Sequence, residues 1–256
     1  MSGDEQALAS VWTRPARTKR ARPELSREQI VSEAIRLLDE EGIDALTMRR
    51  LGSRLGAVAP ALYYHVSSKD ELLELIVDQI YGEIEVAGES ADWRGGAVRT
   101  ARSLRSVILR HPWFGSVIGE AGLVFLGPNM MRASEDILTL FERGGFTLEQ
   151  ADHALNTLIA YVLGSAISEA AYLTMLARSG QSERDLVEQV WPAAEKAAQP
   201  YPRLSKLYAI QHRKNPHGTS EADFDRRLDL FLDGLQTWLS PANSASFESA
   251  QMTAES

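Results

Sequence analysis

The sequence has no cysteine among its 256 residues. This absence excludes a disulfide framework and a thiolate metal site, and it agrees with a reducing compartment. The five histidines are scattered without metal-ligand spacing, and the chain has neither a nucleophile elbow nor a phosphate-binding glycine loop. We therefore expect no metal, no cofactor and no enzymatic activity.

Long hydrophobic runs are also missing. The N-terminal stretch has no apolar core of the kind that a signal peptide carries. The most apolar later stretch, residues 158–167, is only about half as long as the roughly 20 residues that a membrane span needs. We expect a soluble, unexported protein that is located in the cytoplasm.

Positive charge is scarce overall, since the formal net charge is −8. Its distribution is uneven: residues 1–70 carry 11 basic and 10 acidic side chains, and the remainder carries 16 and 25. Within the first part, residues 14–22 hold five basic side chains and no acidic one. This segment is either a solvated tail or an arm that contacts DNA, and the sequence leaves both interpretations open.

The chain shows no alternating strand pattern and no internal repeat, whereas apolar residues recur at helical spacing almost throughout. The sequence therefore predicts an all-α fold. The expected helices are 27–41, 47–55, 59–65, a long one from 68, 93–110, 128–143, 147–177 and 222–239. A polar, proline-containing stretch from residue 200 to 221 is expected to be a mobile loop, and 1–24 and 241–256 to be disordered.

The first four helices carry clear boundary signals. Ser26 and Ser68 are each followed three residues later by Gln or Glu, the pattern of a capping box. Thr47 is a suitable cap for the second helix, and Pro60 is tolerated only in the first turn of the third. Two short helices around a glycine-containing turn predict a helix-turn-helix motif.

The helix at 147–177 is apolar on nearly all sides, which predicts burial on both faces. A second subunit could cover it together with the last helix, or both helices could be core of one chain. The residues expected at a dimer interface are Leu158, Val162, Ala166, Phe224, Leu228, Phe231 and Leu235.

Two stretches, ALTMRRLGSRLG and ALYYHVSSKDELL, closely resemble the DNA-binding region of the tetracycline-repressor (TetR) family of bacterial transcription regulators. The resemblance covers residues 25–80. The later motifs RHPWF, GGFTLEQA and YVLGSAISE are similar to the regulatory domain of the same family, although they are less specific.

The resemblance implies a helix-turn-helix DNA-binding domain at 25–72, joined by a long helix to a ligand-binding and dimerisation domain at 73–240. It implies a homodimer whose recognition helices enter successive major grooves of a palindromic operator. An effector bound in the second domain would change the distance between the two DNA-binding heads.

The same resemblance assigns roles to residues in the helix-turn-helix. Arg49 is the candidate for reading guanine, with a phosphate contact as its alternative. Tyr63 either contacts bases or packs between helices. Backbone phosphates are expected to meet Thr47, Tyr64, His65 and Lys69. The DNA-facing set is completed by Met48, Ala59, Pro60 and Ala61, of which the last three can meet bases only by close approach to thymine methyl groups.

The candidate effector site combines apolar surface with a few polar groups. Its residues are Trp113, Phe114, Phe125, Asn129, Met130, His153, Asn156 and Tyr161, although aromatic residues at helical spacing can equally be plain core. Where tetracycline-binding members use histidines, this sequence has Glu85 and Ile118, which argues against a tetracycline–magnesium effector.

Two regulatory hypotheses remain open. The first is a repressor that a small apolar or amphipathic effector releases from DNA. The second is a DNA-binding dimer without an effector, controlled by its abundance or by a protein partner.

Overall fold

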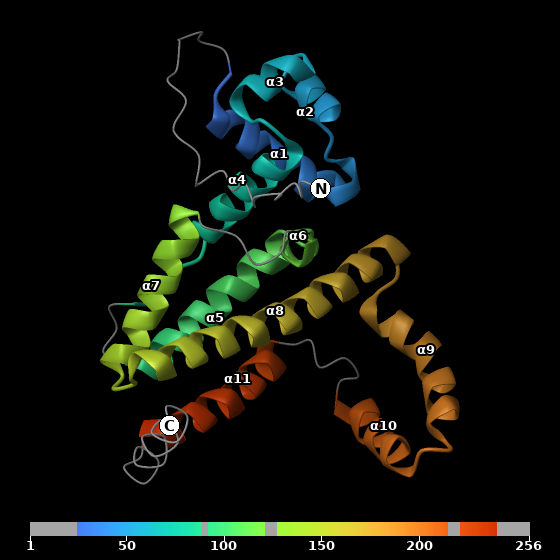
Figure 1. Ribbon diagram of the computed structural model, residues 1–256. Coiled ribbons are helices and arrows are strands. Elements are labelled where there is room, and N and C mark those ends of the chain that lie inside the picture. Colours follow the sequence, from blue (N-terminus) through green and yellow to red (C-terminus); the bar gives the residue numbers. More distant parts are fainter. Residues whose placement is uncertain (1–24, 89–91, 121–126, 215–220, 240–256) are drawn as a thin grey trace, which may run out of the picture. The chain divides into compact units, whose positions relative to one another are not determined.

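A computed structural model of the chain describes residues 25–88, 92–120, 127–214 and 221–239. Every regular element in these ranges is a helix, which confirms the all-α prediction (Figure 1). The elements are α1 (Arg27–Glu41), η2 (Ile43–Ala45), α2 (Met48–Arg54), α3 (Ala59–His65), α4 (Lys69–Tyr81), α5 (Trp93–Arg110), α6 (Phe114–Glu120), α7 (Pro128–Arg143), α8 (Leu148–Ser179), α9 (Glu183–Ala198), α10 (Pro202–Lys214), α11 (Glu221–Gln236) and η3 (Thr237–Leu239).

The chain forms two compact units that divide inside α8, one from Met1 to Leu163 and the other from Gly164 to Ser256. In the first unit α1 packs on α4, α2 on α3, and α7 on both α4 and α5. In the second unit α9 and α10 pack on each other. The expected boundary at residue 72 stays a prediction, and the segments 1–24 and 241–256 lie outside the described residues.

Side-chain caps start several of the helices as predicted. Ser26 Oγ accepts from the N–H of Gln29 at 3.2 Å, and the Gln29 side chain accepts from the N–H of Ser26 at 2.9 Å. The α4 cap differs from the expected box: Ser68 Oγ accepts from Glu71 N–H, but the Glu71 carboxylate accepts from Ser67 N–H, one residue earlier. These bonds satisfy amides that a helix start otherwise leaves unpaired.

The core of the first unit between α5 and α7 contains an aromatic trio. Trp93 lies 5.1 Å from Phe146 and 6.0 Å from Phe141, and the two phenylalanines lie 5.6 Å apart, all measured between ring centroids. All three are buried. Phe146 makes an edge-to-face pair with each of the other two rings, and such pairs stabilise beyond their buried area, so the trio contributes to the packing of α7 on α5.

Helix α10 corrects the expected loop, because residues 202–214 are helical. Pro202 is its first residue, where a missing N–H costs no hydrogen bond. Tyr208 packs on Trp191 of α9 with centroids 5.5 Å apart, a contact between residues too distant in sequence for periodicity to predict.

Helix α8, at 32 residues, is long and apolar enough to cross a membrane by length and composition alone. The apolar stretch at 158–167 is much shorter than α8, because polar side chains occur along the rest of this helix. One stripe of α8 is nevertheless buried in the single chain, at Ala151, Ala154, Leu158, Val162 and Ala166. A single helix of this kind is weak evidence for a membrane span.

Candidate functional site

The turn between α2 and α3 holds the two helices close together. Thr47 Oγ1 accepts from Arg50 N–H at 3.1 Å and starts α2. A side chain at Gly52 would place its Cβ 2.7 Å from the carbonyl oxygen of Ala57, so only glycine fits this position. Gly56 then turns the chain at a φ of +63°. The sequence therefore fixes the approach of α3 to α2, as a helix-turn-helix requires.

Helix α3 begins without a side-chain cap. Val58 is the residue before it and is 70% exposed, and its side chain has no oxygen with which to accept from the first amides. Pro60 is exposed, and Ala59 and Ala61 are partly exposed. This end of α3 presents methyl and methylene groups to its surroundings, which suits close approach to another surface but offers no side-chain hydrogen bond.

Three arginines of α2 differ in their surroundings. Arg54 pairs with Glu33 and Glu40, each at 2.6 Å, and Arg50 pairs with Glu41. Arg49 is exposed, and among the described residues its guanidinium has no such carboxylate partner. Arg49 is therefore the α2 cation that is available for an external ligand.

The remaining predicted DNA contacts lie at the end of α3 and the start of α4. Tyr63 and Tyr64 are 46% and 60% exposed, so Tyr63 is not packed away between helices. His65 is half-buried with its ring 5.2 Å from that of Tyr64, and Lys69 is exposed. Met48 is a correction: it is 8% exposed, which makes its side chain part of the core rather than of the contact face.

Sequence reasoning missed Arg27, whose guanidinium spans three elements. Its Nε and one terminal nitrogen donate to the carbonyl oxygen of His65 at 3.3 and 3.2 Å. The same terminal nitrogen lies 3.5 Å from the buried Glu71 carboxylate. Arg27 thereby ties the C-terminal end of α3 to α1 and α4. The partners are 38 and 44 positions away in the sequence, so no local pattern points to them.

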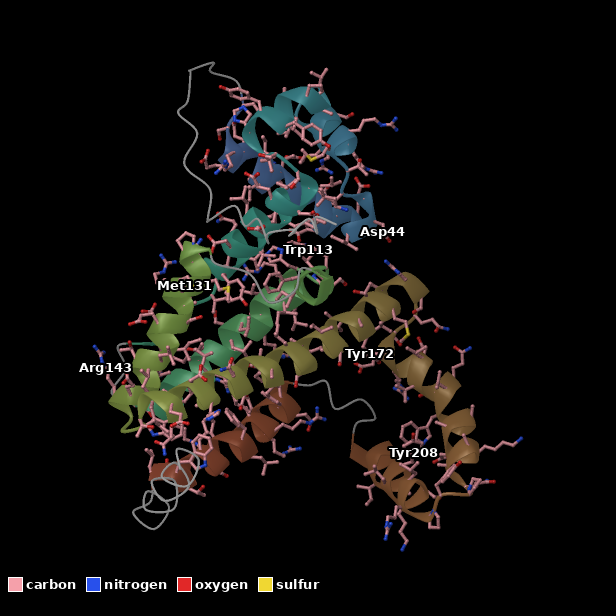
Figure 2. The ribbon with its side chains drawn as sticks, viewed as in Figure 1. Asp44, Trp113, Met131, Arg143, Tyr172 and Tyr208 are labelled. Carbon is pink, nitrogen blue, oxygen red and sulfur yellow. The ribbon has the colours of Figure 1, made fainter. Side chains whose placement is uncertain are left out.

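Part of the predicted effector set gathers around the last two turns of α4. Trp113 (Figure 2) and Phe114 are buried where α6 begins. Phe114 contacts the Tyr81 ring with centroids 6.0 Å apart. Asn129 and Met130 start α7 and donate their backbone amides to Asp78 of α4 at 2.9 and 3.1 Å. Phe114, Asn129 and Met130 link α4 to α6 and α7, whereas the indole of Trp113 donates to Asp39 of α1.

The rest of that set lies elsewhere. His153 and Asn156 are exposed on α8, and Asn156 donates to Asp152 one turn earlier. Tyr161 of α8 is half-buried. Phe125 lies outside the described residues. Which of these side chains meet an effector stays a prediction.

The predicted dimer residues are already covered in the single chain. All except the half-buried Phe231 are buried: Leu158, Val162, Ala166, Phe224, Leu228 and Leu235. Exposed apolar side chains on the same two helices are Leu148, Leu173 and Met175 of α8 and Leu230 of α11.

Two protein-family models match nearly all of the described residues. Residues 30–76 match the family model described as bacterial regulatory proteins, tetR family. Residues 87–239 match the tetracyclin repressor-like C-terminal domain. The first range holds the helix-turn-helix, and the second holds α5 to η3.

Similar proteins agree with these matches. An HTH-type transcriptional regulator of Saccharopolyspora erythraea is 37% identical over 67% of this chain and 72% of its own. The HTH-type transcriptional repressor DrrR1 of Streptomyces coeruleorubidus is 30% identical over 92% and 87%. The crystal structure of ActR of Streptomyces coelicolor with actinorhodin is 31% identical, covers 86% of this chain and all of the other, and has a TM-score of 0.69. The chain belongs to the tetR family of bacterial regulatory proteins and is a DNA-binding transcription regulator, not an enzyme.

Proposed function

We propose that the protein is a homodimeric repressor that binds a palindromic operator and leaves it when a small apolar or amphipathic effector binds. One observation carries the proposal of sequence-specific DNA binding. Arg49 is exposed, whereas the neighbouring Arg50 and Arg54 already form ion pairs with carboxylates. A guanidinium with its fork free can donate to guanine O6 and N7 together in the major groove. In a dimer, half-sites would lie about 34 to 36 Å apart, one helical turn.

Base readout by α3 would depend on shape more than on hydrogen bonds. Its uncapped N-terminal end offers Val58, Ala59 and Ala61, which can contact thymine methyl groups. Tyr64, His65 and Lys69 would meet phosphates, since phosphate contacts position a protein without choosing a sequence. Arg49, Tyr63 and DNA shape would then supply the discrimination between sequences.

We expect Lys69→Ala to weaken binding about equally on operator and random DNA. Loss of one phosphate contact lowers the slope of log K against log salt concentration by about one unit. The measurement is a titration by fluorescence anisotropy at several salt concentrations. Lys206→Ala removes the same charge from the exposed surface of α10 and should leave the slope unchanged. A larger loss on the operator than on random DNA would assign Lys69 to base readout instead.

The effector part of the proposal is supported by the ActR structure, whose ligand is actinorhodin. An effector that binds only the folded chain should raise its thermal stability, by about 2.7 kcal/mol at a hundred times its Kd. Aromatic polyketides, actinorhodin first, are the probes for a thermal-shift screen, followed by operator release. Arg49→Ala is the matched control, because it should bind the operator more weakly and keep the thermal shift. A screen without any shift would favour control by abundance or by a protein partner.

We also infer a cytoplasmic location. The proposed partner, operator DNA, is located in the bacterial cytoplasm. The buried stripe of α8 supports the interpretation of α8 as a core helix rather than a membrane span.

A further inference from the structure

His111 lies buried at the turn between α5 and α6, with 4% of its surface exposed. Its Nδ1 is 2.7 Å from Oδ1 of Asp39, near the end of α1. The indole N–H of Trp113 donates to the same Asp39 oxygen at 2.6 Å. Two donors from one turn therefore converge on a single carboxylate of helix α1.

The other imidazole nitrogen faces a second carboxylate. His111 Nε2 is 3.3 Å from Oε2 of Glu83, just beyond the end of α4. Arg110 of α5 donates to the same Glu83 oxygen at 2.8 Å. The charged groups facing the imidazole are thus Asp39 from α1, Glu83 from the segment after α4, and Arg110 on its own helix behind Glu83.

Only the imidazolium form satisfies both carboxylates. A neutral imidazole has one N–H, so the nitrogen without a hydrogen would turn a lone pair toward a carboxylate oxygen. Burial opposes the charged form, but the hydrogen bonds and charges of Asp39 and Glu83 outweigh it and raise the pKa of His111 above its ordinary value.

We call the contacts of His111 and Trp113 with Asp39 and Glu83 the bridge. The bridge joins two parts of the chain that match separate family models. Asp39 lies within the helix-turn-helix match at 30–76, whereas His111 and Trp113 lie within the C-terminal match at 87–239. Glu83 lies in the short connection between the two matches. The bridge therefore spans the junction through which a regulatory domain would act on the DNA-binding helices.

We propose that protonated His111 is a positioning residue that holds the DNA-binding helices against the regulatory domain, so that operator affinity falls when the residue loses its proton. The inference rests on the proposed function. When DNA-binding helices are already held in position, DNA binding does not have to restrict their motion. Restricting that motion would otherwise cost free energy and weaken the binding.

The pH range follows from the raised pKa. The bridge is complete below about 6.5, the ordinary pKa of histidine, and it is lost as the pH rises through the higher value in the folded chain. We therefore expect operator affinity to be greatest near the lower end of the neutral range. His65 also faces DNA in the proposed complex, so the test must compare chains that share His65.

The first measurement needs no DNA. The rings of Trp113 and His111 lie 5.7 Å apart, and an imidazolium quenches the fluorescence of a nearby indole. Tryptophan emission of the full chain should rise in one transition above pH 6.5, and comparison with His111→Gln separates it from the emission of the four other tryptophans. The transition should vanish in His111→Gln and move to lower pH in Asp39→Asn. Asp44→Asn, an equal charge change at an exposed position of η2, should leave it in place. Emission that stays flat, or a transition that Asp39→Asn does not move, would overturn the inference.

The second measurement compares operator affinity at pH 6.5 and 8.5. Between these values the wild type and Asp44→Asn should lose about fivefold or more, the lower end of typical coupling between sites. Asp39→Asn keeps His65 and should show a smaller loss. Equal affinity at both values, with the fluorescence transition present, would overturn the inference and leave operator binding intact. A chain that binds no operator at either pH would overturn the proposed function itself.

Discussion

Replacing Arg49 by alanine is expected to weaken operator binding by about 5- to 150-fold while leaving binding to random DNA almost unchanged. A bidentate contact to guanine contributes about 1 to 3 kcal/mol of discrimination, and that contact is lost with the guanidinium. Random DNA offers the right base only occasionally, so its binding rests on phosphate contacts instead. The measurement is a pair of titrations, on operator and on scrambled duplex, at one salt concentration.

Arg50→Ala is the matched control for this experiment. It removes an equal charge one residue further along α2, but the Arg50 guanidinium is already paired with Glu41. We expect its effect on operator binding to be several-fold smaller than that of Arg49→Ala. Equal losses on operator and scrambled DNA for Arg49→Ala would show that Arg49 contacts only phosphate.

The second large effect concerns Asp78, which caps a helix to which it does not belong. Helix α7 begins after Gly127, which has no side chain to accept from the first amides. Asp78 Oδ1 accepts from the amides of Asn129 and Met130 instead, and Oδ2 accepts from the Asn129 side chain at 3.0 Å. The carboxylate is 6% exposed, so these bonds are sheltered from water.

We expect Asp78→Ala to lower the free energy of unfolding by about 3 kcal/mol. Hydrogen bonds to a charged group contribute about 1.5 to 3 kcal/mol, and the partly buried amides of Asn129 and Met130 would lose this acceptor. Urea denaturation followed by circular dichroism measures the change. Glu135→Ala removes the same charge from the exposed side of α7 and should shift the value by less than about 0.5 kcal/mol. A loss for Asp78→Ala no larger than this would mean that solvent replaces the cap.

Local patterns in the sequence predicted the helix starts. The box of Ser26 with Gln29 and the Thr47 cap of α2 are both present, and each joins residues only three positions apart. Short-range bonds of this kind depend on the chain's own helical geometry, which the sequence alone determines. The resemblance to the TetR family, carried by two short motifs, is likewise confirmed.

Contacts between distant residues could not be predicted in this way. Asp78 meets Asn129 across 51 positions and Asp39 meets Trp113 across 74, and nothing near either residue specifies its partner. The apolar stripe of α8 illustrates the same limit. The sequence predicts burial on both faces of that helix, whereas in the single chain one stripe is buried and Leu173 and Met175 are exposed. Periodicity does not tell which apolar faces the chain itself covers. Met48 was placed on the DNA-facing side because its neighbours in the motif are, although its own side chain is in the core.

Selection of bound sequences from a random duplex library by the purified chain, at near-physiological salt, tests the central claim most directly. If the protein is a homodimer in which Arg49 contacts base edges, the selected sequences should contain a palindrome whose half-sites lie about one helical turn apart. Each half-site should contain a guanine that Arg49→Ala no longer selects. Recovery of no motif, with binding that merely fades as the salt concentration rises, would contradict operator-specific repression.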